Sequence, residues 1–362
     1  MADNMRTISF IDEFTKDDGC FKEFADFVRE HDELELLFRG NSSDVAIVYF
    51  CNNVVWKFSK LGNIAKVTVN YNHLRYTEKW PEIIKDKYHG LYGFPLVTED
   101  TISSRYDLGG YHDSVIDISK GEKFDKDFVS GLYSVIEEVM SDFFFPYYKN
   151  EIASENDSRL KDHFRDKKGA SQRIRKDGKN YKKPNYLEKQ NQQAYFTSNC
   201  CMDDGVYVYD LEYKEPFADE KAKKAAMASK GREKMNKPDC LGIRFKDKKP
   251  VSLVMIEMKS EAGAESGKSG TGEHLDGMWD DLRDSKFVKD RLKEAHALME
   301  AYKSVKMHGF DGDEVIPSFE DIDTGEILIV YTDDLAKNKM VGEHKADSDK
   351  YPKGIPYTVE LF

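Results

Sequence analysis

The residues best suited to chemistry lie at two points in the second half of the chain. A Pro-Asp pair ending at Asp239 is followed, after seventeen residues, by Glu257-Met258-Lys259 at the end of a long apolar run. Because successive strand residues point to opposite faces, Glu257 and Lys259 would project together while Met258 points into the opposite, apolar layer. Placing charges beside such an apolar strand is costly without compensation. The sequence therefore predicts a functional charge cluster here.

These side chains are of the types that hold a hard divalent cation. If the strand that begins at Asp239 pairs with the strand that ends at Lys259, the two carboxylates converge on one ion. Mg²⁺ or Mn²⁺ prefers oxygen ligands, keeps bound waters and bridges to phosphate. Such an ion polarises a phosphate and lowers the pKa of an attacking water. We therefore expect Asp239 and Glu257 as metal ligands, and Lys259 as the residue that assists the water and balances developing charge.

The elements expected around this cluster follow the order helix, three strands, helix and strand. Their apolar periodicity and turn residues predict these boundaries. We expect helices at 186–196 and 286–306, an inserted helix at 219–235, and strands at 206–213, 241–245, 251–258 and 327–331.

This order, with the Pro-Asp pair and the Glu-X-Lys triplet, resembles the PD-(D/E)XK nuclease superfamily over residues 188–305, about a third of the chain. The resemblance implies an α/β fold with a restriction-endonuclease-like mixed sheet flanked by helices. It also implies a Mg²⁺-dependent (or Mn²⁺-dependent) endonuclease that hydrolyses phosphodiester bonds of nucleic acid, with DNA favoured. Glu188 is expected as a further catalytic acid and metal ligand, and Asp210 and Glu212 compete for that place.

The same resemblance places a polar residue near the phosphate, on the helix after the third strand. Several residues could fill this place, and a histidine on an amphipathic helix is commonly structural. The candidates are His274, Arg291, His296 and Tyr302.

A basic stretch interrupts an otherwise acidic chain. The net charge is −12, yet residues 161–183 hold ten Lys or Arg against three Asp. A local basic surface of this kind binds phosphates whatever the net charge. Within a loop expected at 149–185, the nucleic-acid-binding candidates are Arg173, Arg175, Lys176, Lys182 and Lys183.

Two other functions compete with the nuclease. Residues 262–269 fit a relaxed P-loop pattern that would indicate an NTPase, although the glycines after Lys268 disfavour the helix that must follow. Alternatively, a nuclease-like fold could serve only as a catalytically silent binding or scaffold module. The charge cluster argues against the scaffold, and metal affinity would separate the two cases.

The first part of the chain reads as a separate α+β domain at 1–121, followed by the nuclease domain at 122–362. A helix around Phe24, strands at 34–39, 45–51, 54–59 and 65–70, and a helix at 127–145 are expected. The N-terminal domain could sense a trigger, read substrate or form a homodimer. By analogy, an extra domain on a nuclease core fits antiviral defence, alone or with a partner defence protein.

The composition favours a folded cytoplasmic protein. Hydrophobic residues make up 40% of the chain, which allows a sizeable core. No apolar run approaches the roughly 20 residues of a spanning helix, and we expect no membrane association. The N-terminus lacks an apolar signal core. The five cysteines lack the spacing of a zinc site and are read as small buried residues.

Overall fold

The computed structural model describes residues 9–32, 34–39, 45–50, 53–70, 111–139, 186–211, 213, 220–229, 237–259, 271–332 and 357–362. The chain forms two compact units. One comprises residues 10–36 and 45–190, and the other comprises 1–9, 37–44 and 191–362. None of the described helices is both long and apolar enough to cross a membrane.

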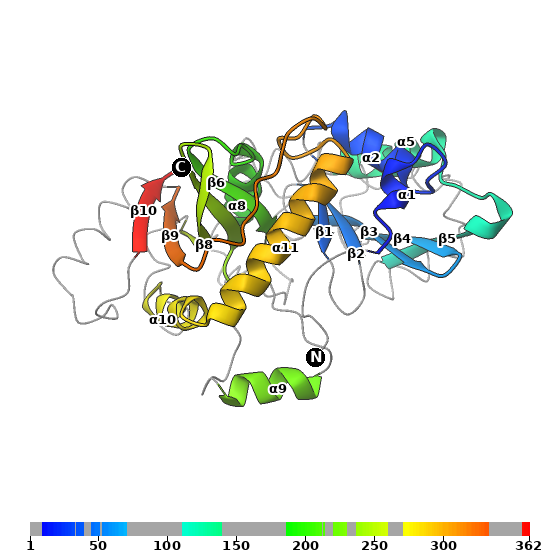
Figure 1. Cartoon of the computed structure of the whole chain (residues 1–362). Helices are drawn as coiled ribbons and strands as arrows, with labels where there is room; N and C mark the ends of the chain where they lie inside the picture. Colours follow the sequence, from blue (N-terminus) through cyan, green and yellow to red (C-terminus); the bar gives the residue numbers. More distant parts are fainter. Residues whose placement is uncertain are drawn as a thin grey trace, which may run out of the picture. The chain divides into compact units, whose positions relative to one another are not determined.

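The N-terminal unit is built on an antiparallel sheet in the order β1-β2-β3-β4-β5 (Figure 1). The meander expected from the sequence is present, and β5 adds a strand that the sequence did not predict. The strands are β1 (Leu34–Arg39), β2 (Val45–Phe50), β3 (Asn53–Leu61), β4 (Ile64–Asn70) and β5 (Tyr111–Asp117). Strand β1 crosses the division between the units.

Aromatic side chains form the core of this unit beneath three helices. The helices are α1 (Asp12–Thr15), α2 (Lys22–Arg29) and α5 (Lys126–Val139). Phe21 and Phe24 of the α2 segment pack their rings against Phe58 of β3, and both also contact Phe124. Helix α5 joins this core through Phe128, so it packs with the N-terminal elements.

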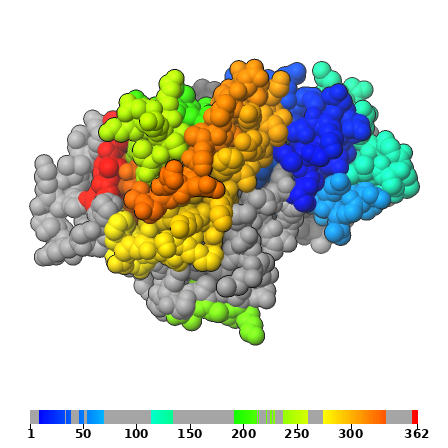
Figure 2. Space-filling model, viewed as in Figure 1, coloured from blue at the N-terminus to red at the C-terminus, as the bar shows by residue number. Residues whose placement is uncertain are grey.

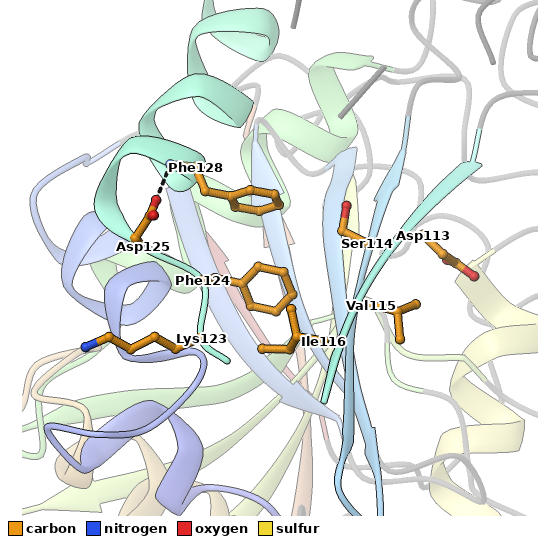
Figure 3. Close-up of a pocket in the computed structure, with 8 residues that line it drawn as sticks. All are labelled: Asp113, Ser114, Val115, Ile116, Lys123, Phe124, Asp125 and Phe128. Carbon is orange, nitrogen blue, oxygen red and sulfur yellow. Dashed lines mark hydrogen bonds between the residues drawn. The ribbon is translucent and has the colours of Figure 1, made fainter. Parts of the chain in front are cut away.

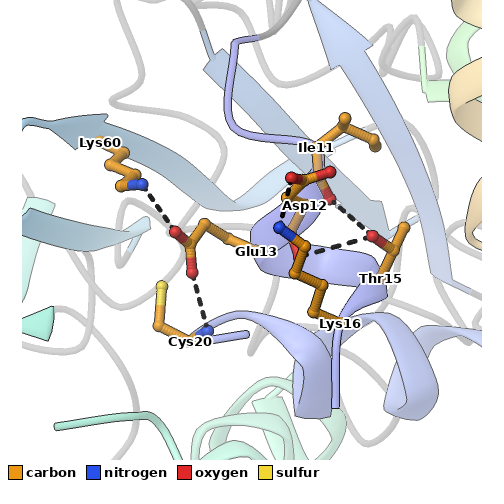
Figure 4. Close-up of polar contacts among 7 residues, drawn as sticks. All are labelled: Ile11, Asp12, Glu13, Thr15, Lys16, Cys20 and Lys60. Atoms are coloured by element: carbon orange, nitrogen blue, oxygen red, sulfur yellow. Dashed lines mark hydrogen bonds and ion pairs between the residues drawn. The ribbon is translucent and has the colours of Figure 1, made fainter. Parts of the chain in front are cut away.

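A half-buried salt bridge also ties α1 to the sheet (Figure 4). Lys60 of β3 donates to one Glu13 carboxylate oxygen at 2.6 Å, and the Cys20 amide donates to the other at 3.2 Å. Burial acts to raise the pKa of Glu13, but the Lys60 ammonium and the Cys20 amide outweigh it and hold that pKa below its usual value. Burial raises the pKa of the Cys20 thiol, which is inert in this setting.

The C-terminal unit is built on a mixed sheet in the order β10-β9-β8-β7-β6. Strands β6, β7 and β8 run antiparallel, and β8, β9 and β10 run parallel to one another. The strands are β6 (Gly205–Leu211), β7 (Cys240–Lys246), β8 (Lys249–Lys259), β9 (Gly325–Tyr331) and β10 (Tyr357–Leu361). Strand β8 lies at the centre and is buried over its last eight residues, as its apolar sequence predicted.

The structure describes four helices in this part of the chain. They are α8 (Tyr186–Ser198), α9 (Glu220–Ser229), α10 (Thr271–Leu282) and α11 (Ser285–Ser304). The sequence located α8, α9 and α11 but not α10, because the Gly/Ser-rich residues before α10 hide where the helix begins. Strand β10 was also not predicted. In Figure 1, α11 runs across the sheet, and in Figure 2 the yellow and orange surfaces of α10 and α11 adjoin each other.

Helices α8 and α10 cover opposite faces of this sheet. Glu257 of β8 and Glu360 of β10 pair with neighbouring residues of β9, so their side chains point to opposite faces. Tyr195 of α8 donates a hydrogen bond to Glu360, whereas His274 of α10 contacts Glu257. The end of β8 therefore lies between two helices that come from distant parts of the sequence.

Candidate functional site

The strand register places Asp239 opposite Glu257. In this antiparallel ladder, Cys240 of β7 pairs with Ile256 of β8. Asp239 comes just before Cys240 and Glu257 comes just after Ile256, so the two acids lie side by side. The Asp239 side chain extends the contact between these strands to the residue just before β7, because its Oδ2 accepts the amide of Met258 at 2.7 Å. The metal site expected from the sequence required the strands of Asp239 and Glu257 to pair, and β7 and β8 do pair.

Glu257 and Lys259 form a buried ion pair at the end of β8. Lys259 Nζ lies 2.5 Å from Glu257 Oε1, and the two side chains are 7% and 3% exposed. Met258, between them, is also buried. The two-residue spacing thus places both charges on one face, as expected for a strand.

His274 reaches the same carboxylate from the first half of α10. Its Nδ1 donates to Glu257 Oε1 at 2.7 Å, while its side chain stays 39% exposed. Oε1 of Glu257 therefore accepts from two donors. Its Oε2 makes no hydrogen bond with the part of the chain that the structure describes.

Gln192 of α8 is a site residue that the sequence did not reveal. This side chain is 3% exposed, and its Nε2 donates to Asp239 Oδ1 at 2.6 Å. The sequence directed attention to the same helix but to an acid, Glu188, whose backbone lies one turn earlier in α8. The Glu188 side chain lies outside the described residues. A glutamine carries no charge signal, so only the fold connects Gln192 to Asp239.

Opposing effects set the ionisation of Glu257. Burial acts to raise the pKa of this carboxyl, because the interior solvates an anion poorly. The hydrogen bond from His274 and the charge of Lys259 outweigh burial and hold the pKa of Glu257 below its usual value. Glu257 is therefore ionised at neutral pH, as a metal ligand must be.

The two carboxylates fit a hard cation that keeps several waters. Asp239 and Glu257 arise from adjacent strand ends, and both hydrogen bonds that Glu257 accepts on its side chain from the described residues end on Oε1, so Oε2 keeps acceptor capacity toward these residues. Mg²⁺ is commonly held by one or two carboxylates together with waters and substrate phosphates. The described residues hold no cluster of three or more His, Cys, Asp or Glu side chains. Within the described part of the chain, Asp239 and Glu257 are the acids that a cation here would use.

Three of the four downstream candidates hold α11 in place. Arg291 donates to the Tyr213 hydroxyl and lies 3.5 Å from Glu294, and all three side chains are buried. Tyr302 donates to the Tyr209 carbonyl at 3.2 Å and also packs against Phe196 and His308. The His296 ring packs edge-on against Phe319. Of the four candidates, the structure brings His274 to Glu257.

Of the two acids that compete with Glu188, the structure describes Asp210 but not Glu212. Asp210 is buried on β6, where it pairs with Leu241, two residues along β7 from Asp239. Glu212 lies outside the described residues. So do the P-loop-like residues 262–269 and the basic candidates Arg173, Arg175, Lys176, Lys182 and Lys183, with the loop at 149–185 that carries them.

The N-terminal unit holds a separate pocket of about 260 Å³ (Figure 3). Side chains of Ile116, Phe124 and Phe128 line it, and Val115 of β5 is exposed beside it. Asp113, Ser114, Lys123 and Asp125 also line it. Among the described residues, the buried Ser114 hydroxyl has no hydrogen-bond partner.

Comparisons with protein-family models, curated proteins and solved structures find no match to this chain.

Proposed function

We propose that this chain is a metal-dependent nuclease that hydrolyses phosphodiester bonds of nucleic acid, with DNA favoured. The observation that carries the proposal is that Asp239, just before β7, accepts the backbone amide of Met258 next to Glu257 on the paired strand β8, with Lys259 bonded to Glu257. The element order of α8, three antiparallel strands, α10 with α11, and parallel β9 agrees with the restriction-endonuclease-like fold that the resemblance implies. That order supports the proposal without fixing the chemistry.

Each residue at the strand ends has a role in this proposal. Asp239 and Glu257 would hold Mg²⁺ or Mn²⁺, which when bound polarises the phosphate and lowers the pKa of a coordinated water. Lys259 would hold the attacking water through its Nζ and stabilise negative charge on the phosphate oxygens. Gln192 and the Met258 amide fix the orientation of Asp239. Glu188 is retained as a fourth participant because it lies on the helix that carries Gln192.

Substrate contact would require positive charge near these acids. A chain of net charge −12 repels a polyanion unless a basic segment offsets that charge locally. Residues 161–183 supply such a segment, and we propose that Arg173, Arg175 and Lys176 contact the phosphate backbone. A binding assay at increasing salt would test this, because loss of phosphate contacts lowers the salt dependence of affinity.

Cleavage assays on four substrates test the proposal directly. Plasmid, linear duplex, single-stranded DNA and RNA are incubated with Mg²⁺ or Mn²⁺ and wild type, Asp239→Asn, Glu257→Gln or Lys259→Ala. Lys249→Ala is a matched control, since Lys249 begins the same strand and is exposed. We expect cleavage by wild type and the control, and loss of cleavage in EDTA and in the other variants. Equal cleavage by all proteins would refute this site.

A catalytically silent scaffold is the second function that the geometry supports, after the nuclease. The Glu257–Lys259 pair satisfies its own charges, as a purely structural ion pair would. Metal binding separates the two functions. A scaffold would bind Mn²⁺ no better than its Asp239→Asn variant, whereas a nuclease centre would lose most of its affinity on that substitution.

The biological role is proposed by analogy alone. A nuclease core joined to a second α+β unit fits antiviral defence, in which the N-terminal unit would sense a trigger, read substrate or form a homodimer. Sedimentation with and without nucleic acid would test the dimer, and phage plating on cells that express wild type or Lys259→Ala would test the role.

A further inference from the structure

We propose that His274 is a positioning residue that reserves one oxygen of Glu257 for the cation. This inference rests on the proposed function, since it concerns how the same centre binds metal. His274 donates to Glu257 Oε1 at 2.7 Å, and Lys259 donates to that same atom at 2.5 Å. The other oxygen, Oε2, accepts no hydrogen bond from the described residues.

The arrangement matters because Lys259 alone does not fix the carboxylate. A lysine ammonium has three donors on a flexible stem and can bridge both oxygens of a carboxylate, which would occupy the lone pairs that a metal needs. A second donor on Oε1, from a different direction, holds the Glu257 carboxylate plane. Glu257 is 3% exposed, so bulk water contributes little to its orientation.

Helix α10 gives His274 a fixed position. Leu275, Met278 and Leu282 of this helix are buried in the core, so the backbone that carries His274 cannot shift freely. The arrangement at Glu257 parallels that at Asp239, where Gln192 of α8 and the Met258 amide each hold one oxygen. A side chain from a helix thus contacts each carboxylate, and partners of this kind typically change metal affinity by about 10- to 100-fold.

Mn²⁺ binding tests the inference without using activity. Free Mn²⁺ is followed by electron paramagnetic resonance during titration of wild type, His274→Ala, His274→Asn and the control His296→Ala. The asparagine amide nitrogen occupies the place of Nδ1 and preserves the donor to Glu257. We expect the Mn²⁺ Kd to rise about tenfold in His274→Ala, and to stay within about threefold of wild type in His274→Asn and His296→Ala.

Three outcomes separate this inference from the function beneath it. If His274→Ala binds Mn²⁺ as tightly as wild type, or more tightly, while Asp239→Asn loses binding, the positioning role is overturned and the metal centre stands. If wild type and Asp239→Asn bind Mn²⁺ equally weakly, the proposed function itself fails. If His274→Asn binds as poorly as His274→Ala although both melt like wild type, the hydrogen bond is not the cause, and the inference is overturned.

Discussion

Replacing Lys259 by methionine tests the buried ion pair independently of any activity. Methionine keeps most of the apolar stem of Lys259 and removes its charge, leaving Glu257 buried without its principal counter-ion. Because Glu257 is nearly inaccessible to solvent, water cannot replace the lost ammonium. We therefore expect a loss of folding stability that depends on the ionisation of Glu257.

The size of that loss follows from the geometry. Opposite unit charges 2.5 Å apart attract by about 7 kcal/mol at an effective dielectric constant of roughly 20. The variant need not lose all of this, because Glu257 can take up a proton instead. Protonating a carboxyl of ordinary pKa costs about 4 kcal/mol at pH 7 and about 1 kcal/mol at pH 5. These values set the upper limit of the destabilisation at each pH.

The pH dependence comes from the variant. In wild type the pKa of Glu257 is lowered, so its contribution to stability is fully present at both pH 5 and pH 7 and disappears only as the pH falls through the folded pKa. Without the Lys259 charge, burial should raise the pKa of Glu257 in the folded variant, which then loses stability as the pH rises above the unfolded pKa. Lys259 should therefore matter more at pH 7 than at pH 5.

Urea unfolding in EDTA at both pH values measures the effect. We expect Lys259→Met to lose about 4 kcal/mol at pH 7 and about 1 kcal/mol at pH 5. The double variant Glu257→Gln/Lys259→Met should recover much of the loss at pH 7, because no charge is left buried. Lys249→Met, an exposed lysine of the same strand, should change little. Equal losses at the two pH values, or no recovery in the double variant, would show that packing rather than charge is responsible.

Three further predictions concern stability elsewhere. Gly309→Ala should cost about 3 kcal/mol or more in urea unfolding, because at φ +85° the added Cβ would lie 1.7 Å from the Cys200 carbonyl oxygen. The control Gly62→Ala, where φ is +58° and the added Cβ meets open space, should cost only about 1 kcal/mol. Burial lowers the pKa of His308 to about 4, so the unfolded state binds the proton more readily than the folded state. As the pH rises from about 4 to about 6.5, the free energy of unfolding of wild type should therefore increase by about 3 kcal/mol relative to that of His308→Gln. Parallel plots of unfolding free energy against pH for the two proteins would contradict this. Phe21→Ala should cost about 3–5 kcal/mol by removing a fully buried ring from its aromatic cluster, and a loss below 1 kcal/mol on thermal or urea unfolding would refute that packing.

Local pattern was enough to locate most elements of both sheets. Alternating or continuous apolar runs separated by Gly and Asn predicted β1 to β4 and β6 to β9, because a strand repeats every two residues whatever it pairs with. The same two-residue period determined that Glu257 and Lys259 share a face. The apolar pattern did not predict α10, where the neighbouring glycines obscured the helix start, nor did it predict β5 and β10.

The partners of the two acids were decided only by tertiary structure. Gln192 and Asp239 are 47 residues apart, and His274 lies 17 residues from Glu257, across a segment with no periodic signal. Sequence period defines the faces of each element, but which helix covers a strand end depends on long-range packing of whole apolar surfaces. The acids and the lysine could therefore be found from their own strands. The side chains that orient them became visible only once α8 and α10 were placed on the two faces of the sheet.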